Sequence, residues 1–170
     1  MGKVQNHFTP GAPGTVTRSV DDIIISIRNA SDGDIPFGAP VFLDTDGAVP
    51  FDLGDPQSFT TFLGFAVRVA DKTPAEYAQS QFPEAAEAGQ AGAWHAGDVM
   101  EVMVRGSISL KVADSGARGG KLYIRKSSGN ITSMAGASGD TVALDNVRIK
   151  NPRTSYTNCC EAVVLSRNIL

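Results

Sequence analysis

The chain has 170 residues, of which 42% are hydrophobic and 7% aromatic, and its 15 basic and 18 acidic side chains give a formal net charge of -3. This length fits one globular domain with a core of aliphatic side chains, and the composition excludes a disordered chain. The small negative charge gives no general attraction to nucleic acid, and no apolar run approaches the ~18 residues that span a bilayer. We therefore expect neither nucleic acid nor a membrane as a partner.

Glycine and proline separate many short apolar runs. The 18 glycines and nine prolines are typical of an all-β protein with many turns, and the runs predict about eight to ten short strands in a barrel or a sandwich. We divide the chain into an extended N-terminal arm, residues 1–19, and a single β-rich domain, residues 20–170. A long loop excursion interrupts the domain at residues 72–94.

The predicted arm, residues 1–19, contains glycine and proline, with Lys3 and Arg18 and without any acid. Such a segment cannot bury enough apolar surface to fold alone. It either stays disordered or lies extended against another surface. In the second case we expect His7, Phe8 and Arg18 to contact a partner.

The first predicted strand covers residues 22–28. Ile23, Ile25 and Ile27 share one face of this strand, and Ile24 lies on the other face. The turn residues that follow end the strand.

A second predicted strand begins at Val41. The dipeptide Asp46-Gly47 favours a hairpin that returns along residues 48–49, because both residues tolerate a positive φ. Asp44, Asp46 and Asp52 suggest calcium, but the spacing does not fit an EF-hand loop, which needs Gly at position six and Glu at position twelve. We expect no metal site.

Residues 62–69 predict another strand, with Phe65, Val67 and Val69 facing the core and Arg68 facing outward.

The excursion at residues 72–94 breaks the strand pattern. A loop of this length is commonly functional, and Tyr77, Phe82 and Trp94 offer enough aromatic area for an interface. Trp94 has a simpler interpretation, which we favour, as a core side chain at the entry to the next strand.

Residues 97–132 predict three or four strands joined by glycine turns, and the rest of the sheet is expected to assemble on them. Alternating apolar and polar residues predict buried faces that include Leu122 and Ile124. Gly106 lies where two apolar runs meet, which indicates a bulge or a sharp bend.

Opposite charges gather in two neighbouring stretches. Residues 105–126 carry six basic side chains and one acid, whereas residues 71–101 carry six acids and one lysine. Two such surfaces would attract neighbouring copies of the chain. The alternative that we favour is that they are solvated faces of separate strands and loops, since exposed charges usually contribute little. Within the basic stretch, Arg118, Arg125 and Lys126 are candidate interface residues.

Further strands are predicted at residues 141–144, 147–149 and 161–166. Just before the last of these, Cys159 and Cys160 are adjacent, and a bridge between neighbours would strain the intervening peptide. We expect one buried and one exposed thiol in a reducing compartment. An intermolecular disulfide is the alternative.

Residues for catalysis are scarce. The chain has two histidines, His7 and His95, and contains neither an HExxH nor a G-x-S-x-G motif. The run of residues 119–121, Gly-Gly-Lys, is not a phosphate-binding loop, because Leu122 stands where Ser or Thr is needed. We therefore expect no catalytic site, no cofactor and no enzyme activity.

The order of the β-segments resembles a known family. The segments are IPFGAPVFL, FLGFAVRV, AGDVMEVMVRGSISLKV, GGKLYIRKSSGNIT and EAVVLSRNIL. Their succession, over residues 20–170, is similar to that of the capsid decoration, or cement, proteins of tailed bacteriophages. The excursion at residues 72–94 has no counterpart in this pattern.

This resemblance implies a β-barrel or β-tulip-like domain on the outside of an assembled phage head, where it stabilises contacts between capsomers. It also implies the major capsid protein as partner, a homotrimer on local threefold positions, and a virion protein made in the host cytoplasm. Repeated weak contacts would give such a protein avidity without a deep pocket. The arm could add a strand to the shell.

Three other classes of function remain open, and one of them is a host β-barrel oligomer unrelated to phages. A glycan- or host-surface-binding head fibre would stack Trp94 and the excursion at residues 72–94 on sugar rings. An enzyme on a β-barrel would need a convergent acid–base pair that the sequence does not display.

Overall fold

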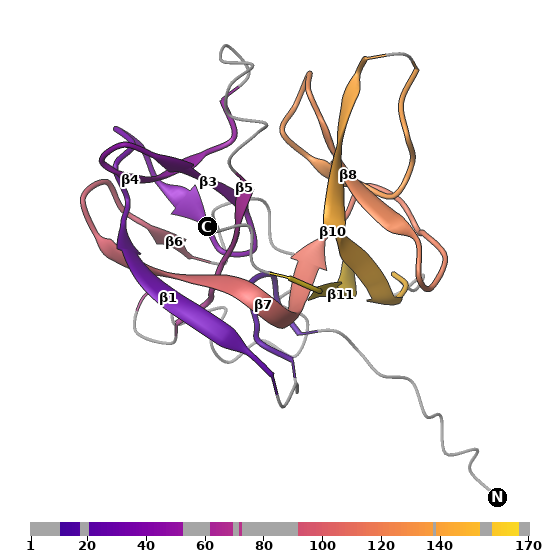
Figure 1. Cartoon of the computed structure of the whole chain (residues 1–170), viewed down its shortest axis with the longest axis horizontal. Helices are drawn as coiled ribbons and strands as arrows, with labels where there is room; N and C mark the ends of the chain where they lie inside the picture. The colour runs from indigo at the N-terminus through magenta and orange to yellow at the C-terminus, as the bar shows by residue number, and fades with distance from the viewer. Residues whose placement is uncertain are drawn as a thin grey trace, which may run out of the picture.

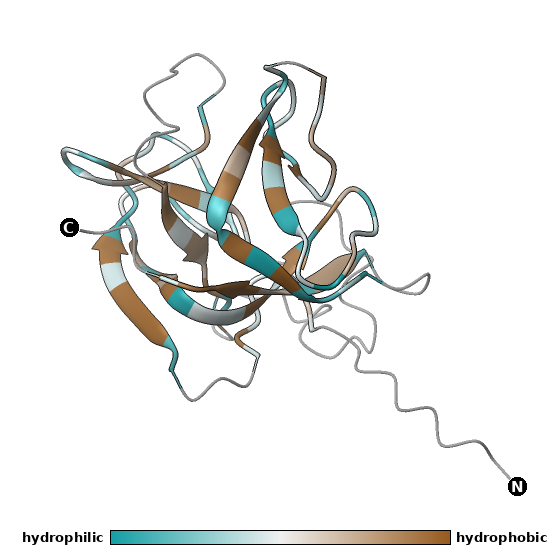
Figure 2. Cartoon of the chain, turned by 45° about the vertical axis from the view of Figure 1, so that its right-hand side comes forward, coloured by the Kyte–Doolittle hydropathy of each residue, from teal (hydrophilic) through white to brown (hydrophobic). Residues whose placement is uncertain are grey.

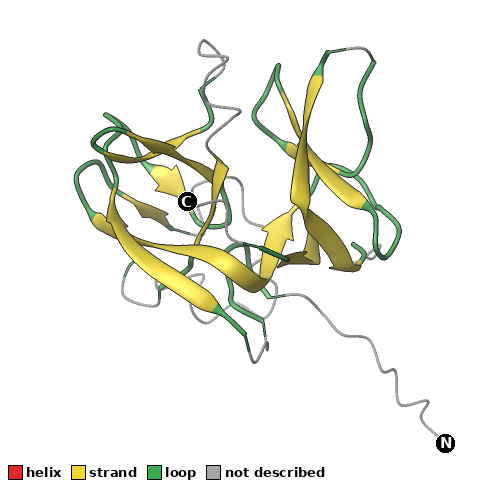
Figure 3. Ribbon diagram, viewed as in Figure 1, coloured by secondary structure: helices red, strands yellow, loops and turns green. Residues whose placement is uncertain are grey.

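The computed structural model describes residues 11–17, 21–52, 62–69, 72, 92–137, 139–153 and 158–166. These residues form strands, turns and loops, with no helix among them (Figure 3), so the all-β prediction is confirmed. In particular, this part of the chain has no helix long and apolar enough to cross a membrane. Its eleven strands are β1 (Ile23–Arg28), β2 (Ile35–Pro36), β3 (Pro40–Asp44), β4 (Gly47–Pro50), β5 (Phe62–Ala66), β6 (Ala93–Trp94), β7 (Val99–Lys111), β8 (Lys121–Arg125), β9 (Ile131–Thr132), β10 (Thr141–Asn151) and β11 (Cys159–Val164).

The sheet is organised around β7, whose 13 residues pass through both halves of the molecule (Figure 1). Up to Arg105, β7 pairs with β1 on one edge and, at Val102 and Met103, with β5 on the other. From Gly106 onward it pairs with β11. The main sheet therefore has the order β4-β3-β5-β7-β11-β10-β8-β9, and β1 joins it at β7.

β7 turns near its middle (Figure 1), where Gly106 has a φ of 123°. A Cβ at this position would lie against the carboxylate of Asp22. Only glycine adopts this backbone conformation without strain, so the bend expected at Gly106 is confirmed. The change of partner from β5 to β11 here divides the described residues into an N-terminal lobe, those within 21–105, and a C-terminal lobe, those within 107–166.

The N-terminal lobe curls into a small, nearly closed barrel. An isolated parallel bridge between Asn29 and Ala48 connects the end of β1 with β4. The approach is close, since a Cβ at Gly47 would clash with the Arg28 carbonyl oxygen. The barrel core inside consists of Ile35, Phe37, Val41, Ala48, Leu63, Ala66, Trp94, Met100, Val102 and Val104.

A second core, which we call the central core, joins the two lobes. Both lobes contribute to it, because alternate residues of β3, β5 and β7 point away from the barrel and toward β8, β10 and β11. Figure 2 shows brown, hydrophobic segments along the strands, interrupted by teal bands of polar residues. The central core consists of Phe42, Phe62, Phe65, Val67, Met103, Ile108, Leu110, Val112, Leu122, Ile124, Ile131, Leu144, Val147, Ile149, Cys160, Ala162 and Val164.

The described part of the predicted arm, residues 11–17, lies along the second half of β7. The N–H groups of Gly14 and Thr17 donate to the carbonyl oxygens of Ser109 and Ser107, both at 2.8 Å. The N–H of Ser109 donates in return to Thr15 at 2.9 Å. This segment is thus hydrogen-bonded to its own domain, and the boundary at residue 19 stays a prediction.

Some strand boundaries differ from the prediction. The hairpin between β3 and β4 exists, but Asp44 pairs with Gly47, so the turn is Thr45-Asp46 and Gly47 begins β4. The two strands predicted at residues 141–149 are one strand, β10, with an irregular register between Leu144 and Arg148. The number of strands exceeds the predicted range because β2, β6 and β9 have two residues each, too few to show a periodicity.

Candidate functional site

The residues predicted to form an interface fall in three places. Trp94 lies in the N-terminal lobe, and Arg118, Arg125 and Lys126 lie on the surface of the C-terminal lobe. The remaining candidates, His7, Phe8, Arg18, Tyr77 and Phe82, lie outside the described residues.

Trp94 is a core residue of the barrel, as its simpler interpretation predicted. Its side chain is buried, and Nε1 donates a hydrogen bond of 2.9 Å to the carbonyl oxygen of Val67. The ring meets Phe37 edge to face, with 6.1 Å between centroids, and Lys72 Nζ lies 5.4 Å from its centre. The indole therefore has no open face on which a sugar ring could stack.

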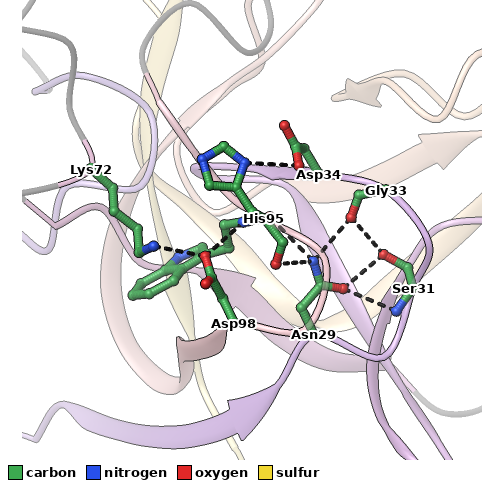
Figure 4. A network of polar contacts seen from close by, with 8 residues as sticks. Asn29, Ser31, Gly33, Asp34, Lys72, His95 and Asp98 are labelled. Atoms are coloured by element: carbon green, nitrogen blue, oxygen red, sulfur yellow. Dashed lines mark hydrogen bonds and ion pairs between the residues drawn. The ribbon is translucent and has the colours of Figure 1, made fainter.

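A buried amide holds two loops together at one end of the barrel (Figure 4). Asn29 is fully buried, and its Nδ2 lies within hydrogen-bond distance of the carbonyl oxygens of Trp94, His95 and Gly33, at 3.2, 3.0 and 3.0 Å. Its Oδ1 accepts from the N–H and the hydroxyl of Ser31, at 3.1 and 2.7 Å. A buried amide whose nitrogen and oxygen both have hydrogen-bond partners holds the loops around it in one geometry.

Ion pairs extend this network toward solvent. Asp98 accepts from Lys72 Nζ at 2.7 Å and from the N–H of His95 at 2.8 Å. These two hydrogen bonds, of which the one from Lys72 has the larger effect, hold the pKa of Asp98 below its ordinary value. His95 Nδ1 lies 2.9 Å from Asp34, but both side chains are largely exposed, so this contact is weak. The network is structural, because none of its charged groups lies in a water-excluded site.

The C-terminal lobe presents a basic surface, to which the candidate residues Arg118, Arg125 and Lys126 belong. Lys121 Nζ lies 2.8 Å from Asp145, and Arg118 donates to Asn151 Oδ1 at 2.7 Å. The described part of this lobe holds eight basic and four acidic residues. The basic residues are Lys111, Arg118, Lys121, Arg125, Lys126, Arg148, Lys150 and Arg153.

The N-terminal lobe has the opposite charge, with nine acidic and four basic residues among those described. Asp32, Asp34, Asp44 and Asp46 are all exposed, in the turn after β1 and in the β3–β4 hairpin. The bridge between Asn29 and Ala48 brings these two turns to one corner of the barrel. Most of these acids lie outside the acidic stretch at residues 71–101, of which Asp98 and Glu101 are the described acids, so the separation of charge between the lobes was not visible in that stretch.

One buried acid was missed by sequence reasoning. Glu161 on β11 is only 2% exposed. Its carboxylate accepts hydrogen bonds from Thr17 Oγ1 at 2.6 Å, from Lys150 Nζ at 2.9 Å and from Asn151 Nδ2. Burial raises the pKa of Glu161, but the three hydrogen bonds and the charge of Lys150 outweigh it, so the pKa lies below its ordinary value.

Glu161 fastens residues 11–17 to the sheet, since it joins Thr17 to β10 and β11. The available signal in the sequence was a single acid within the apolar run CCEAVV. A charged residue in such a run is buried only when it is paired. Its partner Thr17 is 144 positions away, which no local pattern reveals.

The prediction for the two cysteines is wrong in one respect. One of the two was expected to be exposed, but Cys159 and Cys160 are both buried. Cys159 faces away from the central core, yet the structure covers that side of β11 too. Burial is the main cause that raises the pKa of Cys160 to about 12, and the charge of the neighbouring Cys159 is the second. This thiol therefore stays protonated and unreactive.

Within the described residues, no group of three or more His, Cys, Asp or Glu side chains could hold a metal ion. Asp44, Asp46 and Asp52 accordingly form no such group there. The described surface is therefore characterised by its charge and by its strand edges rather than by a coordination site.

Comparison with known proteins gives a family and a fold. The family model described as structural cement protein (E217 gp24/Pam3 gp6) matches residues 2–164. Among solved structures, a chain from the capsid of Myoviridae phage XM1 has a TM-score of 0.69 and 15% sequence identity, over 98% of this chain and 97% of that chain. At this identity the structural likeness shows the fold alone. No curated protein matches the sequence.

Proposed function

This chain belongs to the structural cement protein family of phages, and from this premise we propose that it binds the outside of a tailed-phage head and stabilises the contacts between capsomers. The observation that carries the proposal is the family match over residues 2–164. The family is one of structural proteins and not of enzymes. Under this proposal the chain is made in the host cytoplasm and is a component of the virion.

The architecture supports an adhesive role. Two cores and a shared central strand make a rigid body, so little conformational entropy is lost when its surface meets a partner. Many copies on a head would each add weak contacts, and these sum to a large stabilisation of the assembly.

The proposed capsid-facing surface includes the basic residues Arg118, Arg125 and Lys126. We expect them to meet acidic groups of the major capsid protein, and we expect salt to weaken binding. The arm is the second part of this surface. Since residues 11–17 are hydrogen-bonded to β7, the segment that we expect to add a strand to the shell is the one before Gly11, with His7 and Phe8.

We also propose that the chain forms a homotrimer on local threefold positions of the head, as the resemblance to cement proteins implies. Sedimentation velocity of the purified chain tests this directly. A trimer, or a monomer that becomes trimeric on heads, supports it, and another closed stoichiometry on the head contradicts it.

The main experiment uses heads that lack this protein. Purified chain is added, and bound protein and head melting temperature are measured. We expect saturable binding and a higher melting temperature. Arg125→Glu should weaken binding about tenfold or more, whereas Arg105→Glu, an equal charge change in the N-terminal lobe, should not. Absence of binding by the unmodified chain would refute the proposal.

The sugar-binding alternative loses the residue on which it rested, because the Trp94 ring is buried in the barrel. No described feature favours it over capsid binding.

A further inference from the structure

The ladder of β8 and β10 has one side in the central core and the other side turned outward. Leu122 and Ile124 of β8 are fully buried in that core. Neighbouring residues of a strand point to opposite faces, so the residues between them lie on the outer side. This outer side, which we call the β8–β10 face, consists of Lys121, Tyr123 and Arg125 of β8 and Thr141, Ala143 and Asp145 of β10.

Tyr123 and Ala143 form the centre of the β8–β10 face. They lie opposite each other in the ladder, where Ala143 is exposed and Tyr123 is half-buried. Within the described part of the chain, the Tyr123 hydroxyl has no hydrogen-bond partner. A tyrosine with a packed ring and an accessible hydroxyl is typical of interface anchors, because it offers a large contact area at a low cost in conformational entropy.

Polar contacts hold the two ends of this face in place. At one end, the N–H of Gly136 donates to Thr141 Oγ1 at 3.0 Å. At the other end, Lys121 Nζ lies 2.8 Å from the carboxylate of Asp145. The centre between these contacts is accessible to a partner, since Ala143 is exposed there.

The surroundings of this centre are mainly basic. Five basic and three acidic residues lie on the β8–β10 face or next to it, and they are Arg118, Lys121, Arg125, Lys126, Arg148, Asp114, Asp140 and Asp145. One of the acids, Asp145, already pairs with Lys121. The net charge of the face is therefore positive, and it attracts an acidic surface.

The N-terminal lobe lies on the inner side of this ladder. Aromatic residues of β3 and β5, including Phe42, contribute to the central core beneath β8 and β10, so the β8–β10 face points away from the barrel. Figure 1 shows β4 on one side of the molecule and β8 and β10 on the other. The basic face is therefore distant from the acidic corner of the barrel, which consists of Asp32, Asp34, Asp44 and Asp46.

We propose that Tyr123 is the centre of the surface that binds an acidic surface of the major capsid protein, and that the chain stands on the head on its C-terminal lobe. This inference rests on the proposed function and adds an orientation to it. A partner that attracts the β8–β10 face repels the acidic corner, so the barrel points away from the shell. The described part of the arm begins at the same lobe, where Ser109 Oγ donates to the carbonyl oxygen of Gly11 at 2.5 Å.

Thiol labelling tests the orientation. Ala143→Cys places a thiol at the centre of the β8–β10 face, and Thr45→Cys places one in the exposed β3–β4 turn of the acidic corner. Each variant is treated with a maleimide, both free and bound to heads that lack the unmodified protein. The native cysteines are buried and do not interfere.

Head binding should protect one thiol and not the other. We expect labelling of Ala143→Cys to slow about tenfold when about nine-tenths of the copies are bound, and labelling of Thr45→Cys to stay unchanged. Protection of Thr45→Cys, alone or together with Ala143→Cys, overturns the proposal. Protection of neither thiol overturns it as well.

Tyr123→Ala measures the contribution of the ring to binding. We expect the affinity for heads to fall about tenfold or more. Leu43→Ala is the matched control, because Leu43 is a large apolar side chain that is 40% exposed on β3 of the N-terminal lobe, and its loss should not change the affinity. Melting temperatures of the free variants show whether both are folded, and equal affinities of the two folded variants contradict the proposal.

The other occupant of this face would be the acidic corner of a second copy. In that case Ala143→Cys is protected at high protein concentration without heads, and the assignment to the capsid protein is refuted. If the unmodified chain binds heads but leaves Ala143→Cys reactive, only the assignment of this face fails. If the unmodified chain does not bind heads, the proposed function fails with it.

Discussion

Glu161 is the residue whose side chain connects the most distant parts of the chain. In Glu161→Gln the charge is lost while the size is kept, and Lys150 loses its carboxylate partner. We expect unfolding free energy to fall by about 1–3 kcal/mol, measured by urea denaturation. Asp145→Asn is the control, because Asp145 lies at a similar 2.8 Å from Lys121 but its side chain is 78% exposed. No resolvable change is expected there, and an equal loss in both variants would contradict the role of burial.

The same carboxylate predicts a dependence of stability on pH. Its pKa is lowered on folding, so the folded state holds fewer protons on Glu161 than the unfolded state near the ordinary pKa of 4.5. Its contribution is therefore complete above that pH and is lost as pH falls toward the lower folded value. Urea midpoints measured from pH 7 to pH 3 should fall less steeply for Glu161→Gln than for the unmodified chain. Parallel curves would contradict this.

Gly106 is the residue that allows β7 to serve both lobes. Gly106→Ala places a Cβ against Asp22 and forces a side chain into a φ of 123°. We expect a loss of about 1–3 kcal/mol in unfolding free energy. Gly33→Ala is the matched control, since nothing lies within 4 Å of the added Cβ. Comparable thermal unfolding of the two variants would show that the bend does not need glycine.

At the scale of elements, residues 11–17 act as an added strand of the sheet. Deletion of residues 2–10 keeps the hydrogen bonds of Gly14, Thr15 and Thr17 to β7, and we expect it to leave the melting temperature unchanged. Deletion of residues 2–17 removes Thr17 from Glu161 and uncovers the edge of β7 at Ser107 and Ser109, so it should lower the melting temperature by several degrees.

Head binding separates the two parts of the arm. The shorter deletion should weaken binding to heads if the first ten residues lie on the shell. Unchanged binding and unchanged head stability would reject the proposed role of the arm, whereas equal melting temperatures of the two deletions would reject the stabilising role of residues 11–17.

Individual strands were predictable where one face is buried. Alternation gave the inner faces of β1 and β8 correctly; that of β1 is half-buried, and that of β8 has Leu122 and Ile124 buried. β7 was harder, because both faces are buried over its second half and the alternation weakens. Which strands pair with each other could not be predicted, since β1 pairs with β7 across more than 70 positions of sequence.

At the scale of the whole molecule, the two lobes should unfold together. The central core draws side chains from both lobes, including Phe42, Met103 and Ile149, and β7 runs through both. We expect one cooperative transition, with the fluorescence of Trp94 in the N-terminal lobe coinciding with circular dichroism of the whole chain. Met103→Ala should lower the unfolding midpoint by the same amount in the fluorescence and in the circular dichroism. Two separate transitions would show that the lobes are independent domains.

The sequence by itself determined the all-β class, most strand positions, the bend at Gly106 and the resemblance to cement proteins. These follow from local properties, since side-chain alternation reports which face of a strand is buried and glycine marks unusual backbone angles. Only the tertiary structure decided the burial of Glu161 and both cysteines, the separation of charge between lobes and the approach of β4 to the end of β1. These depend on which strands become neighbours, and the cooperative packing that selects the neighbours joins residues as far apart as Thr17 and Glu161.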